Sequence, residues 1–226
     1  MANGINTIEN FKNARRQFIS TQGKERQSAI KSLPACKEKS IALAVNWGYA
    51  DAARNMVGIK DCKDIKEEAL AEIVKGIKEY FENPAHEDYA DFNEEHRTIC
   101  DIWIRKFKGV NSELAYYGKA QKIVNMAFKY LYCFEGADKY RDYFAFCHVP
   151  LDSYTLKWFC HEWFYRLTKE KGMEVNEDAM PKWSKIKDYD RGIFTYMFFQ
   201  DLFYEWHENE NITPLQAEFI YWPLVK

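Results

Sequence analysis

The stretch that decides the fold is residues 114–131, which read LAYYGKAQKIVNMAFKYL. After its single glycine, apolar side chains recur with the spacing of one helical face, at Ile123, Met126, Ala127, Tyr130 and Leu131. That spacing predicts an amphipathic helix over residues 120–134. Ser112 is a favourable N-cap, and it predicts a short helix that ends at Gly118. The stretch therefore predicts two helices joined by a tight turn at the glycine.

Helical patterns continue on both sides of this stretch. Further helices are expected over residues 5–22, 25–33, 36–55, 64–81, 93–107, 152–171 and 190–206. A last helix is expected to begin at Pro214, because Thr213 is a natural cap and proline a natural first helical residue. Residues 136–149 have an irregular pattern. No stretch alternates at period two over the length of a strand, so the sequence predicts an all-α fold.

The composition indicates a folded intracellular protein. Of the 226 residues, 47% are hydrophobic and 29% charged, which suits a globular core rather than disorder or a membrane. We find no secretory signal and no membrane-spanning stretch, and expect a cytoplasmic location. The six cysteines include no C-x-x-C pair, and no helical ligand pair supports a metal site at His148 or His161. Neither a metal nor an organic cofactor is expected.

The distribution of charge bears on nucleic-acid binding. The net charge of -2 is unfavourable for binding DNA, because phosphate contacts supply much of the affinity. Residues 103–130 nevertheless carry six basic side chains against one acidic one, whereas residues 61–100 are strongly acidic. The basic ones are Arg105, Lys106, Lys108, Lys119, Lys122 and Lys129. A basic face opposite an acidic face fits a DNA role, and solvated faces without a partner are the alternative.

Two residues of opposite charge are the candidates for chemistry. Lys122 lies one turn into the second predicted helix, and Asp152 stands at the start of a later helix in the sequence Val-Pro-Leu-Asp. A turn between helices can present N–H groups to a phosphate, with the lysine pointing into the cleft beneath. Asp152 also suits an N-cap role, which is compatible with a chemical one. Lys129, two turns further along nearly the same face, is a rival to Lys122.

This arrangement resembles the helix-hairpin-helix DNA glycosylase superfamily. Its bifunctional members carry a glycine-rich hairpin that ends in a nucleophilic lysine, followed by an aspartate. Here GKAQK, from Gly118 to Lys122, stands for the hairpin, with alanine in place of the second glycine, and Asp152 stands for the aspartate. The lysine-to-aspartate spacing is most similar to that of the archaeal-type 8-oxoguanine DNA glycosylases. Residues 214–222, PLQAEFIYW, look like the helix from which 8-oxoguanine glycosylases read the flipped base.

The resemblance implies a fold and a reaction. It implies two helical lobes, residues 36–134 and residues 1–35 with 150–226, and a cleft between them. A damaged purine, with 8-oxoguanine as the first guess, would be excised from double-stranded DNA through a Schiff base on Lys122, with Asp152 as the activating carboxylate. The DNA strand would then be cut at the abasic site. The residues implied in DNA binding are Gly118, Lys119 and Gln121, and those in base recognition are Gln216, Trp222, Met126 and Ile220.

Two other functions fit the same residues. A non-catalytic helix-hairpin-helix module would bind DNA and be indifferent to the loss of Lys122. An all-helical interaction or regulatory protein would have no DNA role, which the net charge of -2 allows. In either case Gln216 would be an ordinary solvent-facing residue of a terminal helix.

Overall fold

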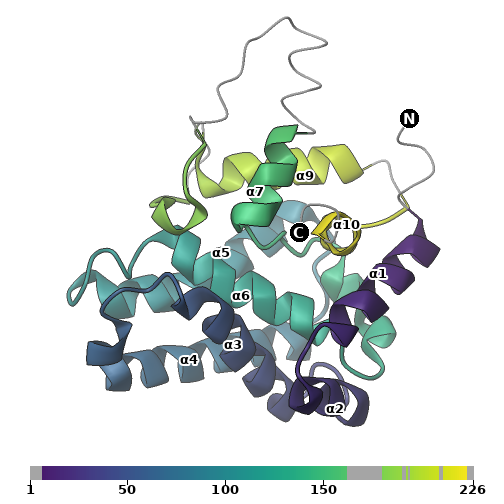
Figure 1. The fold of residues 1–226 in the computed structure, drawn as a ribbon, viewed down its shortest axis with the longest axis horizontal. Helices are drawn as coiled ribbons and strands as arrows, with labels where there is room; N and C mark the ends of the chain where they lie inside the picture. The colour runs from purple at the N-terminus through teal and green to yellow at the C-terminus, as the bar shows by residue number, and fades with distance from the viewer. Residues whose placement is uncertain (1–6, 162–179, 190–191, 193, 209–210, 223–226) are drawn as a thin grey trace, which may run out of the picture.

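The computed structural model describes residues 7–161, 180–189, 192, 194–208 and 211–222. Over these residues the protein is all-helical, which confirms the predicted fold class (Figure 1). The β-type pairing described within them is one isolated bridge between Pro34 and Glu135. Among the helices so described, none combines the length and the apolar character needed to cross a membrane. The division into two lobes stays a prediction.

Apart from the short helix expected between Ser112 and Gly118, the expected helices are present with shifted ends. The first half of the chain contains α1 (Ile8–Ser20), α2 (Lys24–Ser32), α3 (Glu38–Ala53), the 3-10 helix η1 (Ile59–Cys62), α4 (Lys63–Glu82) and α5 (Tyr89–Lys108). The second half contains α6 (Tyr117–Leu131), the 3-10 helix η2 (Ala137–Phe144), α7 (Ser153–Phe159), the 3-10 helix η5 (Trp183–Lys185), α9 (Tyr196–His207) and α10 (Pro214–Tyr221). The expected helix over residues 152–171 begins as α7, and residues 162–179 lie outside the described part.

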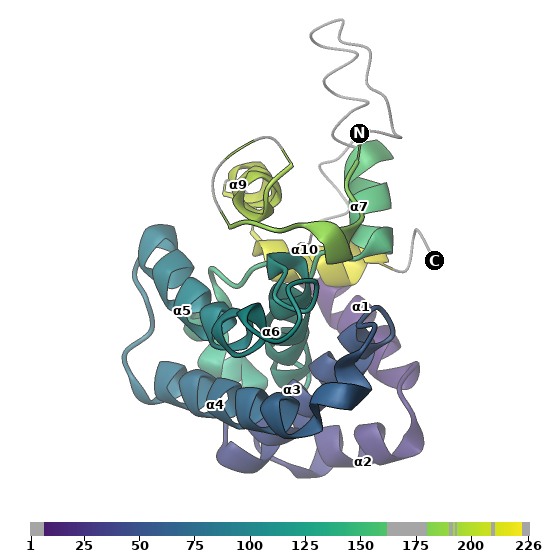
Figure 2. The ribbon, with the colours of Figure 1, turned by 90° about the vertical axis from the view of Figure 1, so that its left-hand side faces the viewer.

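Helix α6 lies at the centre of the molecule, where it packs against α3 and α5 (Figure 2). The sequence predicted an amphipathic helix, but every residue of α6 is buried. Helix α3 approaches it closely at Gly48, where a Cβ atom would lie 2.4 Å from the carbonyl oxygen of Ile123. The polar side chains of α6 are therefore inside the protein and require partners there.

The first and last described helices meet beside α6. Helix α1 packs against α10, with the rings of Phe11 and Phe18 at 5.6 and 5.4 Å from that of Phe219. At the start of α10, Thr213 and Gln216 form a capping box in which each side chain accepts a hydrogen bond from the other's backbone N–H. This capping fixes where α10 begins, and the aromatic contacts fix the face it presents to α1.

The predicted hairpin has a different geometry. Residues 112–115 form turns rather than a helix, and α6 begins at Tyr117, so that Gly118 lies inside its first turn. The side chain of Asn111 accepts hydrogen bonds from the N–H groups of Glu113 and Leu114, which stabilises a turn in place of the helix. The predicted tight turn at Gly118 is therefore wrong.

Candidate functional site

A pocket of about 470 Å³ opens beside α6. Its walls come from α1, α3, α6, the start of α7 and the end of α10, and include Phe18, Asp51, Lys122, Met126, Lys129, Asp152 and Trp222. Both residues predicted to be catalytic thus lie in one pocket, together with two of the four residues predicted for base recognition. The pocket has a volume typical of sites for small molecules.

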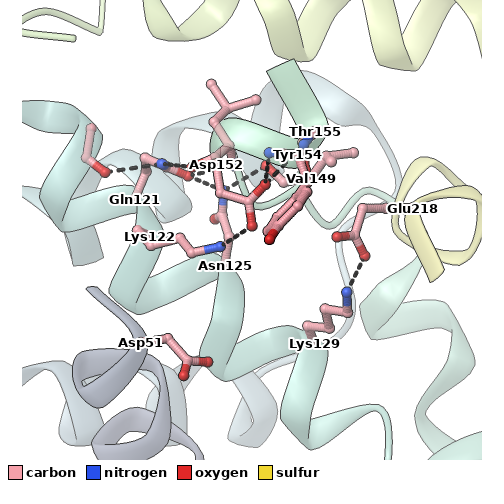
Figure 3. Close-up of polar contacts among 12 residues, drawn as sticks. Asp51, Gln121, Lys122, Asn125, Lys129, Val149, Asp152, Tyr154, Thr155 and Glu218 are labelled. Atoms are coloured by element: carbon pink, nitrogen blue, oxygen red, sulfur yellow. Dashed lines mark hydrogen bonds and ion pairs between the residues drawn. The ribbon is translucent and has the colours of Figure 1, made fainter. Parts of the chain in front are cut away.

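Lys122 and Asp152 form an ion pair in the pocket wall (Figure 3). The Nζ atom of Lys122 lies 2.8 Å from Oδ2 of Asp152, and the two side chains are 6% and 15% exposed. The other oxygen, Oδ1, accepts hydrogen bonds from the backbone N–H groups of Tyr154 at 2.9 Å and Thr155 at 2.8 Å. Asp152 therefore caps α7 with one oxygen and holds the lysine with the other.

The surroundings of Asp152 favour its ionised form. Burial opposes ionisation of this carboxyl group, but the positive charge and hydrogen bond of Lys122 and the Thr155 N–H outweigh that effect. The pKa of Asp152 therefore lies below its usual value. At neutral pH the site therefore holds an ionised carboxylate, fixed by Lys122 and by the backbone N–H groups of Tyr154 and Thr155.

Three buried amides hold the chain that leads to Asp152. Gln121 donates to the carbonyl of Leu151 at 3.0 Å and accepts from its N–H at 3.2 Å. Asn125 and Gln200 donate to the carbonyl of Val149 at 3.1 and 2.8 Å. Such amides are positioning residues, since their loss would leave buried backbone groups unsatisfied. This role was not predicted from the sequence, although the i, i+4 spacing of Gln121 and Asn125 on one helix was a usable signal.

Behind these amides lies a buried cluster of polar rings. His96 is hydrogen-bonded to Asn125 at 2.6 Å, and His148 to Tyr196 at 2.8 Å and Asn93 at 2.7 Å. Burial lowers the pKa of His96 to about 4, so this ring is neutral at physiological pH. Both nitrogens of His148 have protein partners. These histidines therefore act as hydrogen-bonding partners within the core.

Lys129, the rival nucleophile, is more enclosed than Lys122. Its side chain is 1% exposed and its Nζ atom lies 2.5 Å from Oε2 of Glu218. The same ammonium lies 4.5 to 5.2 Å from the ring centroids of Phe18, Phe219 and Trp222. Burial raises the pKa of Glu218 while the charge of Lys129 opposes that rise. Of the two candidate amines, Lys122 is therefore the more accessible from the pocket.

Two of the four side chains predicted for base recognition line the pocket, and the other two do not. Trp222 and, from α6, Met126 line the pocket, whereas Gln216 and Ile220 are not among its described wall residues. The amide of Gln216 donates to the hydroxyl of Tyr132 at 2.7 Å and accepts from the N–H of Thr213 at 3.0 Å. Ile220 is a core residue, 8% exposed. The prediction that these two side chains face the base is corrected, because capping and packing use them elsewhere.

The residues predicted to bind DNA at the hairpin face inward. The N–H of Gly118 donates to the carbonyl of Ile186 at 2.9 Å, and that of Tyr117 to Lys187 at 3.2 Å. Lys119 is 3% exposed and donates to the carbonyl of Glu113 at 2.5 Å. Gln121 is fully buried among the amides described above. These groups have protein partners in place of a phosphate, so the predicted contact surface is wrong in this geometry.

The predicted basic face is also corrected. Lys119, Lys122 and Lys129 are all buried, and Lys106 is paired with Glu68 at 3.1 Å and Glu72 at 2.7 Å. Of the six basic side chains counted between residues 103 and 130, four are thus directed inward or neutralised. The other two, Arg105 and Lys108, are exposed, so only two of the six basic side chains are left unpaired on the surface of this segment among the contacts described.

Gly118 is expected to tolerate no side chain. A Cβ atom at this position would lie 1.8 Å from the carbonyl oxygen of Trp183, a backbone atom that cannot rotate away. We expect Gly118→Ala to lower the free energy of unfolding by about 2 kcal/mol or more, measured by urea denaturation. Gly109→Ala is the control, because a Cβ atom there meets nothing within 4 Å. Equal stability of the two variants would contradict the packing of η5 on α6.

Comparison with protein-family models, with curated proteins and with solved structures found no match to this chain. What the pocket can do is therefore inferred from the chemistry of its own side chains.

Proposed function

We propose that this protein is a DNA glycosylase with abasic-site lyase activity. The observation that supports it is the Lys122–Asp152 pair, an amine and a carboxylate 2.8 Å apart in the wall of a pocket of about 470 Å³. A damaged purine, with 8-oxoguanine as the first candidate, would be the base removed. The proposal depends on this pair and not on the hairpin, whose predicted geometry has been corrected above.

The reaction starts with the amine of Lys122. The ammonium first passes a proton to a neighbouring acceptor, and Asp152 is the nearest one. The free amine attacks C1′ of the sugar, the bond from C1′ to the base breaks, and the base leaves with the electron pair and takes up a proton. Asp152 passes the proton it received to the departing base, and the carboxylate restored in this way stabilises positive charge on the sugar.

Strand cleavage follows from the covalent adduct. The sugar ring opens and the lysine nitrogen forms an imine with C1′. Loss of a proton from C2′ then expels the 3′ phosphate, and water releases the lysine. The atoms balance without an oxidant, a reductant or a metal ion.

Aromatic groups in the pocket suit a base that has left the double helix. Trp222 and Phe18 lie with their ring centroids 5.9 Å apart, and Tyr154 lies 6.2 Å from Trp222. Met126 adds an apolar surface to the same wall. Extrusion of a base costs a few kcal/mol, and stacking on such side chains offsets that cost. We infer that Trp222 is the main stacking residue.

The test of this proposal is covalent capture. Mixing the protein with duplex DNA that contains 8-oxoguanine or an abasic site, followed by borohydride, should reduce the imine to a stable protein–DNA adduct. The adduct is detected as a shifted band on a denaturing gel. Absence of an adduct on both substrates, with folded protein at low salt, would refute the lyase activity.

Three exposed basic residues near the pocket are the proposed phosphate contacts. Arg54 lines the pocket, and Lys157 and Lys182 line a second one that shares Asn55, Ser153 and Trp183 with it. We expect replacement of all three by glutamine to weaken duplex binding, measured by fluorescence anisotropy titration. The slope of the logarithm of the binding constant against the logarithm of the salt concentration should fall by about 1 for each phosphate that is no longer neutralised. Replacement of the exposed Lys12, Lys75 and Lys139 is the control, with equal loss of charge. An identical fall in the two triple variants would contradict this placement.

A further inference from the structure

Asp51 is a carboxylate of the pocket wall that the reaction does not use. It comes from α3 and lines the same pocket as Lys122 and Lys129, and Figure 3 shows it on the α3 ribbon below Lys122. Each of these lysines already has its own carboxylate, Asp152 at 2.8 Å and Glu218 at 2.5 Å. Asp51 is therefore not needed to balance either ammonium group.

A relay of hydrogen bonds fixes Asp51 in place. The hydroxyl of Tyr130 donates to Oδ2 of Asp51 at 2.8 Å, and Arg26 donates to that hydroxyl at 2.6 Å. The guanidinium of Arg26 is itself held over the rings of Trp47 at 5.3 Å and Tyr130 at 5.2 Å. Burial raises the pKa of Tyr130, which keeps its hydroxyl a donor. The carboxylate is thus oriented before any ligand arrives.

The second oxygen of Asp51 remains open to a ligand. Oδ1 lies 4.0 Å from Nη1 of Arg26, which is beyond hydrogen-bonding distance, and it accepts no hydrogen bond from the residues that the structure describes. The side chain is 23% exposed and that exposure is toward the pocket. An ionised carboxylate only accepts hydrogen bonds, so its natural complement is a pair of N–H groups.

We propose that Asp51 determines which base the pocket takes, by accepting hydrogen bonds from the N–H groups of a guanine-type edge. This edge offers a ring N–H next to an exocyclic amino group, both donors. An adenine-type edge presents an unprotonated ring nitrogen at the corresponding place, so two acceptors would face each other. The inference rests on the proposed glycosylase function and adds the residue that selects the base.

The experiment compares two bases that differ only at this edge. Single-turnover excision is measured from duplexes that contain 8-oxoguanine or 8-oxoadenine, in the wild type, in Asp51→Asn and in the control Asp64→Asn. Asp64 is exposed in the first turn of α4 and loses the same charge. We expect the wild type and the control to prefer 8-oxoguanine to the same degree. Asp51→Asn should reduce the preference by about tenfold or more, because an amide both donates and accepts.

Each outcome bears on one proposal at a time. An unchanged ratio of the two rates in Asp51→Asn, or a wild type that removes 8-oxoadenine at least as fast, overturns the role of Asp51 while leaving the glycosylase intact. At an abasic site there is no base for Asp51 to recognise. Failure of the wild type to form an adduct with DNA that contains such a site therefore overturns the proposed function instead. Tyr130→Phe removes the hydrogen bond that orients the carboxylate of Asp51 but keeps the carboxylate itself. This variant should lower the preference for 8-oxoguanine over 8-oxoadenine by a smaller factor. It replaces Asp51→Asn if that variant does not fold.

Discussion

Lys122→Ala is expected to abolish covalent capture by borohydride and to slow base excision by roughly a thousandfold or more. The reason is that Lys122 supplies the nitrogen of the proposed imine, and a methyl group has no nucleophile to replace it. The measurement is adduct yield on abasic DNA together with single-turnover excision of 8-oxoguanine. Far-UV circular dichroism verifies that the variant is folded, which we expect because Asp152 still caps α7.

Two other lysines make this result specific. Lys60 is exposed on η1, and Lys60→Ala should form as much adduct as the wild type. Lys129→Met should still form an adduct, although at a changed rate, because the covalent bond is to Lys122. An adduct that persists in Lys122→Ala and vanishes in Lys129→Met would show that the enclosed lysine is the nucleophile and reverse the assignment.

Lys129→Met is expected to have the largest effect on stability, a loss of about 3–5 kcal/mol in the free energy of unfolding. The change leaves the carboxylate of Glu218 buried without its partner, and Glu218 is 3% exposed. Lys129→Met combined with Glu218→Gln should regain much of that loss, since no charge is then left unpaired. Urea denaturation of the four proteins at pH 7 gives the coupling energy between the two residues.

An exposed pair on α4 is the matched control for this cycle. Lys75 and Glu79 are four residues apart with Nζ and Oε1 at 3.7 Å, and their side chains are 76% and 56% exposed. Lys75→Met should cost no more than about 0.5 kcal/mol, as is usual for surface pairs. A loss in Lys129→Met as small as that in the control would mean that Glu218 is solvated or protonated without its lysine.

Much of the site was predictable from local sequence signals. The helical spacing around Lys122 correctly predicted a helix there, and Asp152 before Ser153 correctly predicted a cap. Those two local features bring the amine and the carboxylate to neighbouring helix starts. Thr213 and Pro214 marked the start of α10 in the same way. Such signals depend on a few consecutive residues, so they can be recognised without knowledge of the three-dimensional structure.

The remainder depends on contacts between distant segments. The turn expected at Gly118 is replaced because residues 183–187 lie on the first turn of α6 and accept its N–H groups. No pattern within residues 112–122 predicts that residues 183–187 pack there. The relay from Arg26 through Tyr130 to Asp51 was missed for the same reason, since its members come from α2, α6 and α3. Gln216 was misplaced because an amide suits a capping box as well as a base.

Because the pocket depends on the contact between α1 and α10, its stability can differ from that of the central helices. Phe18 and Trp222 come from opposite ends of the chain, yet their ring centroids lie 5.9 Å apart in one wall. Contacts of such long sequence separation form late in folding, because closing the chain has an entropic cost that local helices avoid. The pocket therefore requires the contact between α1 and α10 in addition to the central helices, and a local opening of that contact can remove the pocket without melting them. Helical content therefore does not measure how many molecules can bind a ligand. Molecules in which α3 to α6 are intact can still lack the pocket.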